Sequence, residues 1–267
     1  MRFTPYRVAP ALAPYVELVW MLEGTASHDS ETVLPNGAVE LIVNLGSPHK
    51  VVDPKNTQAT VFTESWIAGI QQAPLTIQAV RESNLVGIRF RPGGCRPFLG
   101  APLTEITDQV IEARELFGPL IEKLRERVCR APSAAERLQA IEAALLEQIG
   151  SVAVDPLAAS AVAMLTGSGG RVRTGRVADL LGTTEKTLIA RFSRTVGVTP
   201  KVFARITRLQ NVIRAVSNQT TPDWADVALS CGYFDQSHLI NDFRRLSGTT
   251  PEDYIRRRDA DENHMVP

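Results

Sequence analysis

The sequence has few of the residues on which disulfide-rich and metal-binding proteins depend. Its 267 residues include four histidines and three cysteines, and Cys95, Cys129 and Cys231 are far apart, with no Cys-x-x-Cys spacing. This pattern predicts neither a disulfide framework nor a zinc site. Long apolar runs are also missing, because glutamates flank the apolar segment Leu18–Leu22, so we expect no signal peptide or membrane span. We therefore expect a cytoplasmic protein in a reducing environment.

Signals of catalysis are missing as well. The sequence contains no nucleophile motif, phosphate-binding loop or GxGxxG motif. The alternative is a cupin-like metal enzyme with His28, Glu40 and His49 as candidate ligands, but no His-x-His pair supplies two ligands from one strand face. Cys95 in Gly-Gly-Cys is a candidate thiol sensor, although no neighbouring pattern indicates a lowered pKa. We predict that the protein is not an enzyme and uses no cofactor or metal.

The net charge is zero, but the charges are unevenly distributed. Residues 153–258 hold 15 Lys and Arg against 9 Asp and Glu, whereas residues 1–152 hold 14 against 17. The basic part indicates a partner rich in phosphates. A chain of this length suits two domains. We expect an N-terminal domain over 1–152, a basic domain over 153–258 and an acidic, disordered tail over 259–267.

The basic part contains a sequence repeat. The segment FRRLSGTTPEDY at 243–254 recurs as FSRTVGVTPKVF at 192–203, with matching Phe, Arg, Gly, Thr and Pro residues at a constant offset (243 against 192). Each copy predicts that one helix ends at a left-handed glycine and that the next begins at Thr-Pro. Apolar residues at helical spacing over 201–217 predict a long helix between the copies. We therefore predict two helix-turn-helix motifs joined by a long helix.

The two copies resemble the paired helix-turn-helix domain of the AraC/XylS transcriptional regulators. The resemblance rests on TEKTLIARFSRTVGVTPKVF and on GYFDQSHLINDFRRLSGTTPEDY, of which the second is highly specific. It implies a sequence-specific transcription regulator that reads two successive major grooves with two recognition helices. The implied partners are double-stranded DNA and RNA polymerase. The alternative is a protein-interaction module with a vestigial helix-turn-helix pair.

The surface that would face DNA follows from the helical period. Leu and Phe four residues apart mark the core side of each second helix, so the opposite side is predicted to face the groove. Asn and Gln can bond adenine, Arg and Lys can bond guanine, and apolar groups can contact thymine methyls. The candidate DNA-contacting residues are Lys186, Thr187, Ile189, Ala190, Ser193, Gln236, Ser237, Ile240, Asn241 and Arg244.

Other residues near these helices carry separate expectations. Asp242 is expected to place a negative charge near the groove, and Arg258 is a candidate phosphate contact. His238 is predicted to form a structural hydrogen bond near the helix start. The aromatic residues predicted to pack in the core or in a turn are Trp224, Tyr233 and Phe234.

The N-terminal part reads as short strands followed by helices. Apolar residues alternate over 39–45 and over 85–90, and turn signals separate these segments, which predicts an antiparallel sheet or small barrel. Two apolar stripes at helical spacing follow, the second opened by the capping box Ser133-x-x-Glu136. The predicted fold class for the whole chain is therefore α+β. The predicted stripes are Leu116, Leu120, Leu124 and Val128, then Leu138, Ile141, Leu145 and Ile149.

The segments LPNGAVELIVNL and GIRFRPGG also resemble the sensory domain of one branch of AraC-type regulators. This resemblance implies a small-molecule effector, and we place it on the concave face of the strands, at Val43, Ile88 and Phe90. The second helical stripe has two interpretations. It forms a homodimer contact within 115–149, or both helices pack on the sheet as one core.

Overall fold

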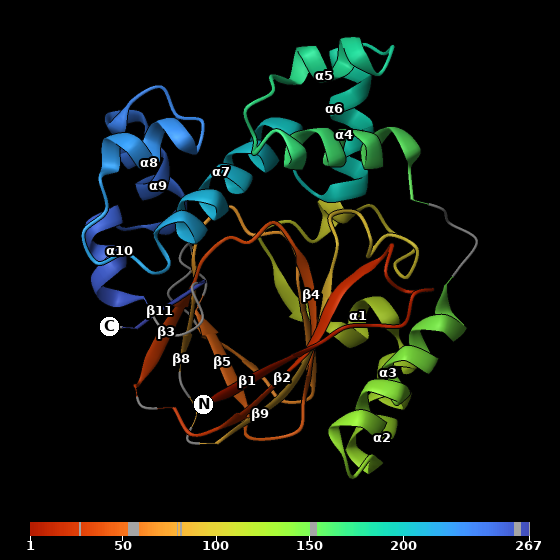
Figure 1. Cartoon of the computed structure of the whole chain (residues 1–267). Helices are drawn as coiled ribbons and strands as arrows, with labels where there is room; N and C mark the ends of the chain where they lie inside the picture. Colours follow the sequence, from red (N-terminus) through yellow and green to blue (C-terminus); the bar gives the residue numbers. More distant parts are fainter. Residues whose placement is uncertain are drawn as a thin grey trace.

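The structure, a computed structural model, describes residues 1–26, 28–52, 59–78, 80, 82–149, 154–258 and 263–266. The N-terminal half consists of antiparallel strands followed by helices, and the C-terminal half is helical (Figure 1). This arrangement confirms the predicted α+β fold class. The predicted domain boundary at residues 152 and 153 lies outside the described residues.

Two antiparallel sheets form the N-terminal half. The larger has the order β1-β2-β9-β4-β7-β10 and the smaller the order β11-β3-β8-β5-β6. The larger sheet comprises β1 (Arg2–Tyr6), β2 (Val16–Gly24), β9 (Ser83–Phe90), β4 (Val39–Asn44), β7 (Ser65–Ala68) and β10 (Val110–Glu112). The smaller comprises β11 (His264–Met265), β3 (Ser30–Val33), β8 (Leu75–Gln78), β5 (His49–Val52) and β6 (Ala59–Phe62).

The alternating residues of β4 and β9 divide between the two faces of the larger sheet. The two strands pair in antiparallel register, with Leu41 opposite Ile88 and Val43 opposite Val86. These apolar side chains are buried in the main hydrophobic core, which the sheet shares with the helices. Between them, Ile42 and Leu85 belong to a second apolar cluster. The predicted strand periodicity is therefore confirmed, and both faces of the sheet are covered.

Helices α1 (Ala113–Phe117), α2 (Pro119–Arg130) and α3 (Ala134–Gln148) follow the larger sheet. Gly118 separates α1 from α2, so the first predicted stripe is divided between two helices. Ser133 Oγ accepts a hydrogen bond from the Glu136 amide and donates one to the Glu136 carboxylate. The predicted capping box therefore starts α3.

The apolar stripe of α3 is buried within the chain. Ile141 and Leu145 are at most 5% exposed, and Leu138 and Ile149 pack against the same core as the sheet. This burial agrees with the interpretation in which both helices pack on the sheet. The predicted homodimer contact through 115–149 is wrong for this stripe, because its side chains already have partners in their own chain.

The C-terminal half is a series of short helices around one long helix. Its helices are α4 (Pro156–Gly167), α5 (Thr174–Leu180), α6 (Glu185–Val196), α7 (Pro200–Val216), α8 (Trp224–Ser230), α9 (Gln236–Ser247) and α10 (Pro251–Arg257). Gly197 and Gly248, with φ of 104° and 74°, end α6 and α9 in the left-handed conformation. Thr199 and Thr250 cap the helices that follow. The helix ends predicted from the repeat are therefore confirmed.

The two copies also pack alike. Phe192 and Phe203 contact edge to face, with ring centroids 5.7 Å apart and an interplanar angle of 63°. Phe243 and Tyr254, the corresponding pair of the second copy, have a centroid distance of 5.6 Å and an angle of 61°. Such pairs contribute about 0.5–1.5 kcal/mol beyond the burial of their surface. The repeated sequence therefore encodes a repeated packing unit.

The two halves of the chain are joined by several contacts. Gln210 of α7 donates from Nε2 to the Pro35 carbonyl and to Asn263 Oδ1, both at 2.8 Å. Thr107, after the short helix η1 (Leu103–Glu105), donates to the Gly197 carbonyl at 2.6 Å. One continuous core contains residues of both halves. The helical half is therefore docked on the strands.

The segment after α10 returns to the N-terminal half. Residues His264 and Met265 form β11, which pairs with Val33 and Thr32 of β3 (Figure 1). The predicted disordered tail over 259–267 is wrong for residues 263–266, because His264 and Met265 pair with β3, the Asn263 carbonyl accepts the Leu34 amide, and the Val266 amide bonds the Arg257 carbonyl. Residues 259–262 and 267 lie outside the described residues.

Candidate functional site

The first candidate site is the outer surface of α6 and α9. Thr184 Oγ1 accepts the Thr187 amide at 3.2 Å, and Asp235 Oδ1 accepts the His238 amide at 2.7 Å, so both helices start at a capping side chain. The Leu and Phe residues that mark the core side are fully buried in both copies. The opposite side of each helix is left at the surface.

The structure places the ten candidate DNA-contacting residues on this outer surface. The exposed ones are Lys186, Thr187, Ala190, Gln236, Ser237, Asn241 and Arg244, and the half-buried ones are Ile189, Ser193 and Ile240. The second copy presents the richer hydrogen-bonding set, because Asn241, Gln236 and Arg244 can all bond base edges. Their contact with DNA stays a prediction.

Asp242 does not face this surface. It is 8% exposed, and its carboxylate accepts hydrogen bonds from Arg205 Nε at 2.7 Å and from an Arg208 guanidinium nitrogen at 3.3 Å. Arg208 also lies over the Tyr233 ring, 5.2 Å from its centroid. The expected negative charge near the groove is therefore a wrong prediction. Asp242 instead ties α9 to α7 through a buried ion pair.

Two further expectations meet different outcomes. Arg258 donates to the carbonyl oxygens of Val216 and Gln219, at and just after the end of α7, and its contact with a phosphate stays a prediction. His238 accepts the Phe234 amide at 3.4 Å and packs edge-on against the Tyr233 ring, in agreement with its predicted structural role.

The three aromatic residues that were predicted to pack in the core or in a turn differ in their burial. Tyr233 is buried and Trp224 half-buried, but Phe234 is 84% exposed, so the packing prediction is wrong there.

The second candidate site is a cavity of about 760 Å³ inside the N-terminal half. Residues of both sheets line it, and most of the lining is apolar or aromatic. A volume of this size suits a small organic ligand. The apolar and aromatic lining residues include Leu18, Trp20, Leu22, Val33, Ile42, Val51, Trp66, Leu75, Ile77 and Leu85.

The predicted effector contacts are on the other face of the sheet. Val43, Ile88 and Phe90 are 0% exposed in the core shared with the helices, and they do not line the cavity. Their strand neighbours Ile42 and Arg89 line it instead. Because side chains alternate along a strand, an error of one position exchanges the two faces. The three predicted residues therefore lie on the face of these strands that is opposite the cavity.

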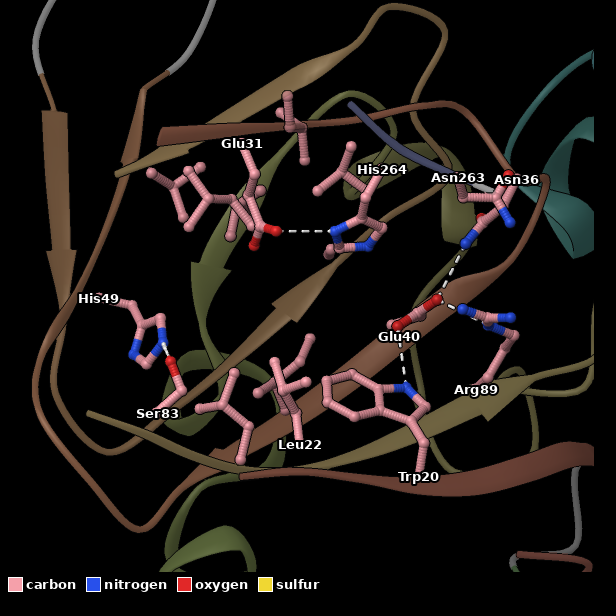
Figure 2. A pocket seen from close by; sticks show the side chains of 18 of the residues that line it. Trp20, Leu22, Glu31, Asn36, Glu40, His49, Ser83, Arg89, Asn263 and His264 are labelled. Atoms are coloured by element: carbon pink, nitrogen blue, oxygen red, sulfur yellow. Dashed lines mark hydrogen bonds and ion pairs between the residues drawn. The ribbon is translucent and has the colours of Figure 1, made fainter. Parts of the chain in front are cut away.

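Glu40 holds one polar corner of the cavity (Figure 2). Its Oε1 accepts hydrogen bonds from Arg89 Nε at 2.8 Å and Asn36 Nδ2 at 2.9 Å, and its Oε2 accepts one from Trp20 Nε1 at 3.2 Å. The Trp20 indole lies over the neighbouring strand β9 at Gly87. It can do so because residue 87 is glycine, since a Cβ atom there would lie 1.9 Å from the indole. The Glu40 carboxylate is therefore fully occupied in orienting the indole and the guanidinium.

Glu31 forms a second polar corner. Its Oε2 lies 2.9 Å from His264 Nδ1 (Figure 2). The same oxygen lies 3.9 Å from His28 Nε2, so imidazoles from two segments that are distant in the sequence approach it. His49 forms a third corner, 3.5 Å from Ser83 Oγ and 3.0 Å from the Ser47 carbonyl. Burial lowers the pKa of His49 against smaller opposing effects of the Ser47 carbonyl and Glu31. His49 is therefore held in its neutral form.

The candidate metal ligands of the cupin-like alternative are not gathered on one point. Glu40 bonds Arg89 and Trp20, whereas His49 bonds Ser83 in a different corner. Within the described part of the chain, no group of three or more His, Cys, Asp or Glu residues could hold a metal ion. These donors do not fit the metal site of that alternative.

Two other features bear on function. Cys95 is fully buried, and this burial raises the pKa of its thiol, which does not suit the thiol-sensor interpretation. In the part of the chain that the structure describes, no helix has the length and apolar character needed to cross a membrane.

Sequence reasoning missed most of the cavity. Glu31, Trp20 and His264 line the cavity but were not predicted as site residues, because isolated polar or aromatic residues in short strands carry no periodic signal. One signal was available: the chain has four histidines, and three of them, His28, His49 and His264, line this cavity. Residues so scarce, when three of them gather in one place, indicate a site.

Two domain families match separate parts of the chain. A domain of unknown function (DUF6597) matches residues 4–112, and a helix-turn-helix domain matches residues 177–257. The comparison with curated proteins gives no match. The first matched range covers most of the strand-rich half, which contains the cavity, and the second covers most of the half with the repeated helices.

Solved structures of ToxT from Vibrio cholerae are similar in fold. The apo form of a ToxT variant has 14% sequence identity and a TM-score of 0.50, covering 89% of this chain and 96% of that chain. ToxT bound to (E)-4-(8-methylnaphthalen-1-yl)but-3-enoic acid has 10% identity and a TM-score of 0.50, covering 96% and 98%. The AraC-like transcriptional activator CuxR has 10% identity and a TM-score of 0.33, covering 78% and 79%.

Proposed function

This chain is a DNA-binding transcription regulator of the AraC family, and from that premise we propose that α6 and α9 read two successive major grooves under the control of a small-molecule effector. The observation that carries the proposal is the matching construction of the two copies. Each recognition helix starts at a side-chain cap, buries Leu and Phe on one side and presents its other side outward. A pair of equivalent reading surfaces suits a pair of half-sites.

The long helix supports a reading of two grooves. Helix α7 has 17 residues and spans roughly 25 Å at about 1.5 Å per residue. The buried pair of Asp242 with Arg205 and Arg208 fixes α9 to this helix. Successive half-sites on one face of DNA are about 34 Å apart. A rigid spacer of this length, with a recognition helix at each end, can reach both.

The charge distribution supports the same role. Residues 153–258 carry a net charge of +6, from 15 basic and 9 acidic residues, in a chain whose total is zero. Basic side chains beside the recognition helices attract the phosphate backbone and release counterions on binding. The affinity for DNA is therefore expected to fall steeply as salt is raised.

The cavity supports control by an effector. It is enclosed by the two N-terminal sheets, yet Asn263 and His264 in its lining come from the segment that follows the DNA-binding helices. ToxT, which shares this fold, has been solved with a small organic acid bound. A ligand in the cavity of this chain would touch both halves, so its presence can alter how they are held together.

Selection of binding sites from random duplex DNA with the purified full-length protein tests the proposal. We expect an enriched sequence with two half-sites about 10 base pairs apart, and binding that weakens strongly between low and physiological salt. Recovery of one half-site alone would remove the two-groove proposal. Absence of any enriched sequence, in a protein shown to be folded by circular dichroism, would favour a protein-interaction module with vestigial helices.

A further inference from the structure

The turns of the two helix-turn-helix motifs differ in length. The first helices of the motifs, α5 and α8, begin at residues 174 and 224, which are 50 positions apart. The second helices, α6 and α9, begin at residues 185 and 236, which are 51 positions apart. The turn of the second motif therefore holds one residue more than the turn of the first.

Backbone hydrogen bonds identify the additional residue. The amides of Thr183 and Tyr233 donate to equivalent alanine carbonyls of α5 and α8, at 3.0 and 2.9 Å, so these two residues correspond. The helix caps Thr184 and Asp235 also correspond, because each accepts the amide three residues further on. In the first motif the cap follows Thr183 directly, whereas in the second motif Phe234 stands between Tyr233 and the cap. Phe234 is therefore the additional residue.

The turn holds the backbone of Phe234 and leaves its ring at the surface. The Phe234 amide donates to His238 Nδ1 at 3.4 Å, and the preceding Tyr233 side chain is buried beneath Arg208. An apolar residue just before a helix cap often packs against the fourth residue of the helix, which here is the buried Leu239. The Phe234 ring is instead 84% exposed. The second motif thus presents an aromatic ring to the outside at a defined place.

This place borders the surface that is proposed to read DNA. Residues at the N-terminus of a recognition helix contact base edges in the major groove, and Phe234 lies two positions before Gln236, the first residue of α9. Thymine carries a methyl group in that groove, and a Phe side chain can contact it. The residues that follow Phe234, namely Asp235, Gln236 and Ser237, are exposed and polar. A single ring beside polar groups fits a base edge better than it fits an apolar protein surface.

We propose that Phe234 is a specificity-determining residue, whose ring contacts the C5-methyl group of a thymine at the edge of the half-site read by α9. This inference rests on the proposed function, since it assumes that α9 lies in the major groove. The first motif has no residue at the equivalent place, so α6 lacks this contact. The thymine preference is therefore confined to one half-site, and it fixes the direction in which the protein lies on its DNA.

The experiment removes single methyl groups from the DNA. Each thymine of a site selected by the full-length protein is replaced in turn by deoxyuridine, and the affinity is measured by titration. At one thymine we expect binding about fourfold weaker, the change expected for losing one buried methyl group. Phe234→Ala is expected to abolish this sensitivity, and Phe234→Leu, which keeps an apolar side chain, to retain it. Val61→Ala, at an exposed position on β6, is the control and should also retain it.

The outcomes separate this inference from the function on which it rests. If no site is selected, the proposed function fails and the inference fails with it. If a site is selected but Phe234→Ala stays as sensitive to deoxyuridine as the unaltered protein, only the inference fails. A loss of affinity for all sequences alike in Phe234→Ala would place the ring on the DNA backbone and overturn the thymine contact. Unchanged DNA binding with reduced transcription by purified RNA polymerase would overturn it in favour of a protein contact.

Folding of the variants is checked by circular dichroism and urea denaturation. Because the Phe234 ring is 84% exposed, both replacements are expected to leave the unfolding transition unchanged. The deoxyuridine series on the unaltered protein is a second measurement that needs no variant. Equal affinity for every duplex in that series would contradict a thymine contact by itself.

Discussion

His264 Nδ1 lies 2.9 Å from Glu31 Oε2, although the two residues are 233 positions apart in the sequence. The contact joins β11, which follows the helix-turn-helix repeat, to β3 at the edge of the N-terminal cavity. It is supported by a hydrogen bond of 2.8 Å from the Leu34 amide to the Asn263 carbonyl. The N-terminal cavity is therefore built partly from the C-terminal segment.

Replacing His264 tests how much this contact contributes. We expect His264→Ala to lower the free energy of unfolding by about 1–3 kcal/mol, because it leaves a confined carboxylate without one of its hydrogen-bond donors. Urea denaturation of the full-length protein measures the effect. His238→Ala is the matched control, since His238 is exposed and makes one long hydrogen bond. Equal losses in both variants would mean that the Glu31 contact has no special weight.

Replacing Asn241 tests which side of α9 reads DNA. We expect Asn241→Ala to relax the sequence preference at one base pair by about 1–3 kcal/mol, the usual worth of a bidentate base contact. Site selection from random DNA gives the preference of each variant. Glu252→Ala, at an exposed position on α10, serves as the control and should leave the selected sequence intact. An unchanged preference in Asn241→Ala would show that this residue does not touch a base.

Replacing Asp242 distinguishes a structural role from an electrostatic effect on DNA binding. Asp242→Asn leaves Arg205 and Arg208, whose side chains are 15% exposed, without their counter-charge. We expect a loss of about 3–5 kcal/mol of stability, as for other broken buried pairs. A charge effect at the groove would instead give tighter DNA binding at unchanged stability. Denaturation curves and DNA titrations on the same preparation, with exposed Asp226→Asn alongside, decide between them.

The buried His49 predicts a pH dependence of stability. Burial lowers its folded-state pKa below the ordinary value of 6.5. Above that pH the imidazole is neutral in both states and has no effect. As the pH falls below 6.5, the unfolded chain takes up a proton before the folded chain does, so stability decreases. We expect His49→Gln to reduce this slope in denaturation curves recorded between pH 7 and the folded-state pKa, and an unchanged slope would contradict the role of His49.

The helical half was largely predictable from the sequence because its signals are local. Gly197 and Gly248 end helices through their own backbone freedom, and Thr-Pro starts the next ones, so a few neighbouring residues determine each boundary. The 3.6-residue period then assigns the buried side of each helix. The outward placement of Asn241 follows from that period alone.

The cavity was not predictable, because its residues come together only through long-range pairing. Glu31, Glu40 and His264 lie on three strands, and no sequence pattern fixes how β11 reaches β3. In β9 the alternation marks one apolar face, but both faces of this sheet are covered, so the alternation could not tell the cavity side from the helix side. Asp242 was misplaced for a similar reason, since its arginine partners are on another helix.

The late position of β11 in the chain also sets an order for assembly. A ribosome makes the β-rich half first, but the strand that completes the edge of its smaller sheet emerges only after α10. The usual sequence, in which an N-terminal domain folds fully before the next is made, cannot apply here. Until the helix-turn-helix repeat has been synthesised, β3 remains an open edge able to pair with other chains. A fragment cut between the two halves would carry that same unprotected edge permanently.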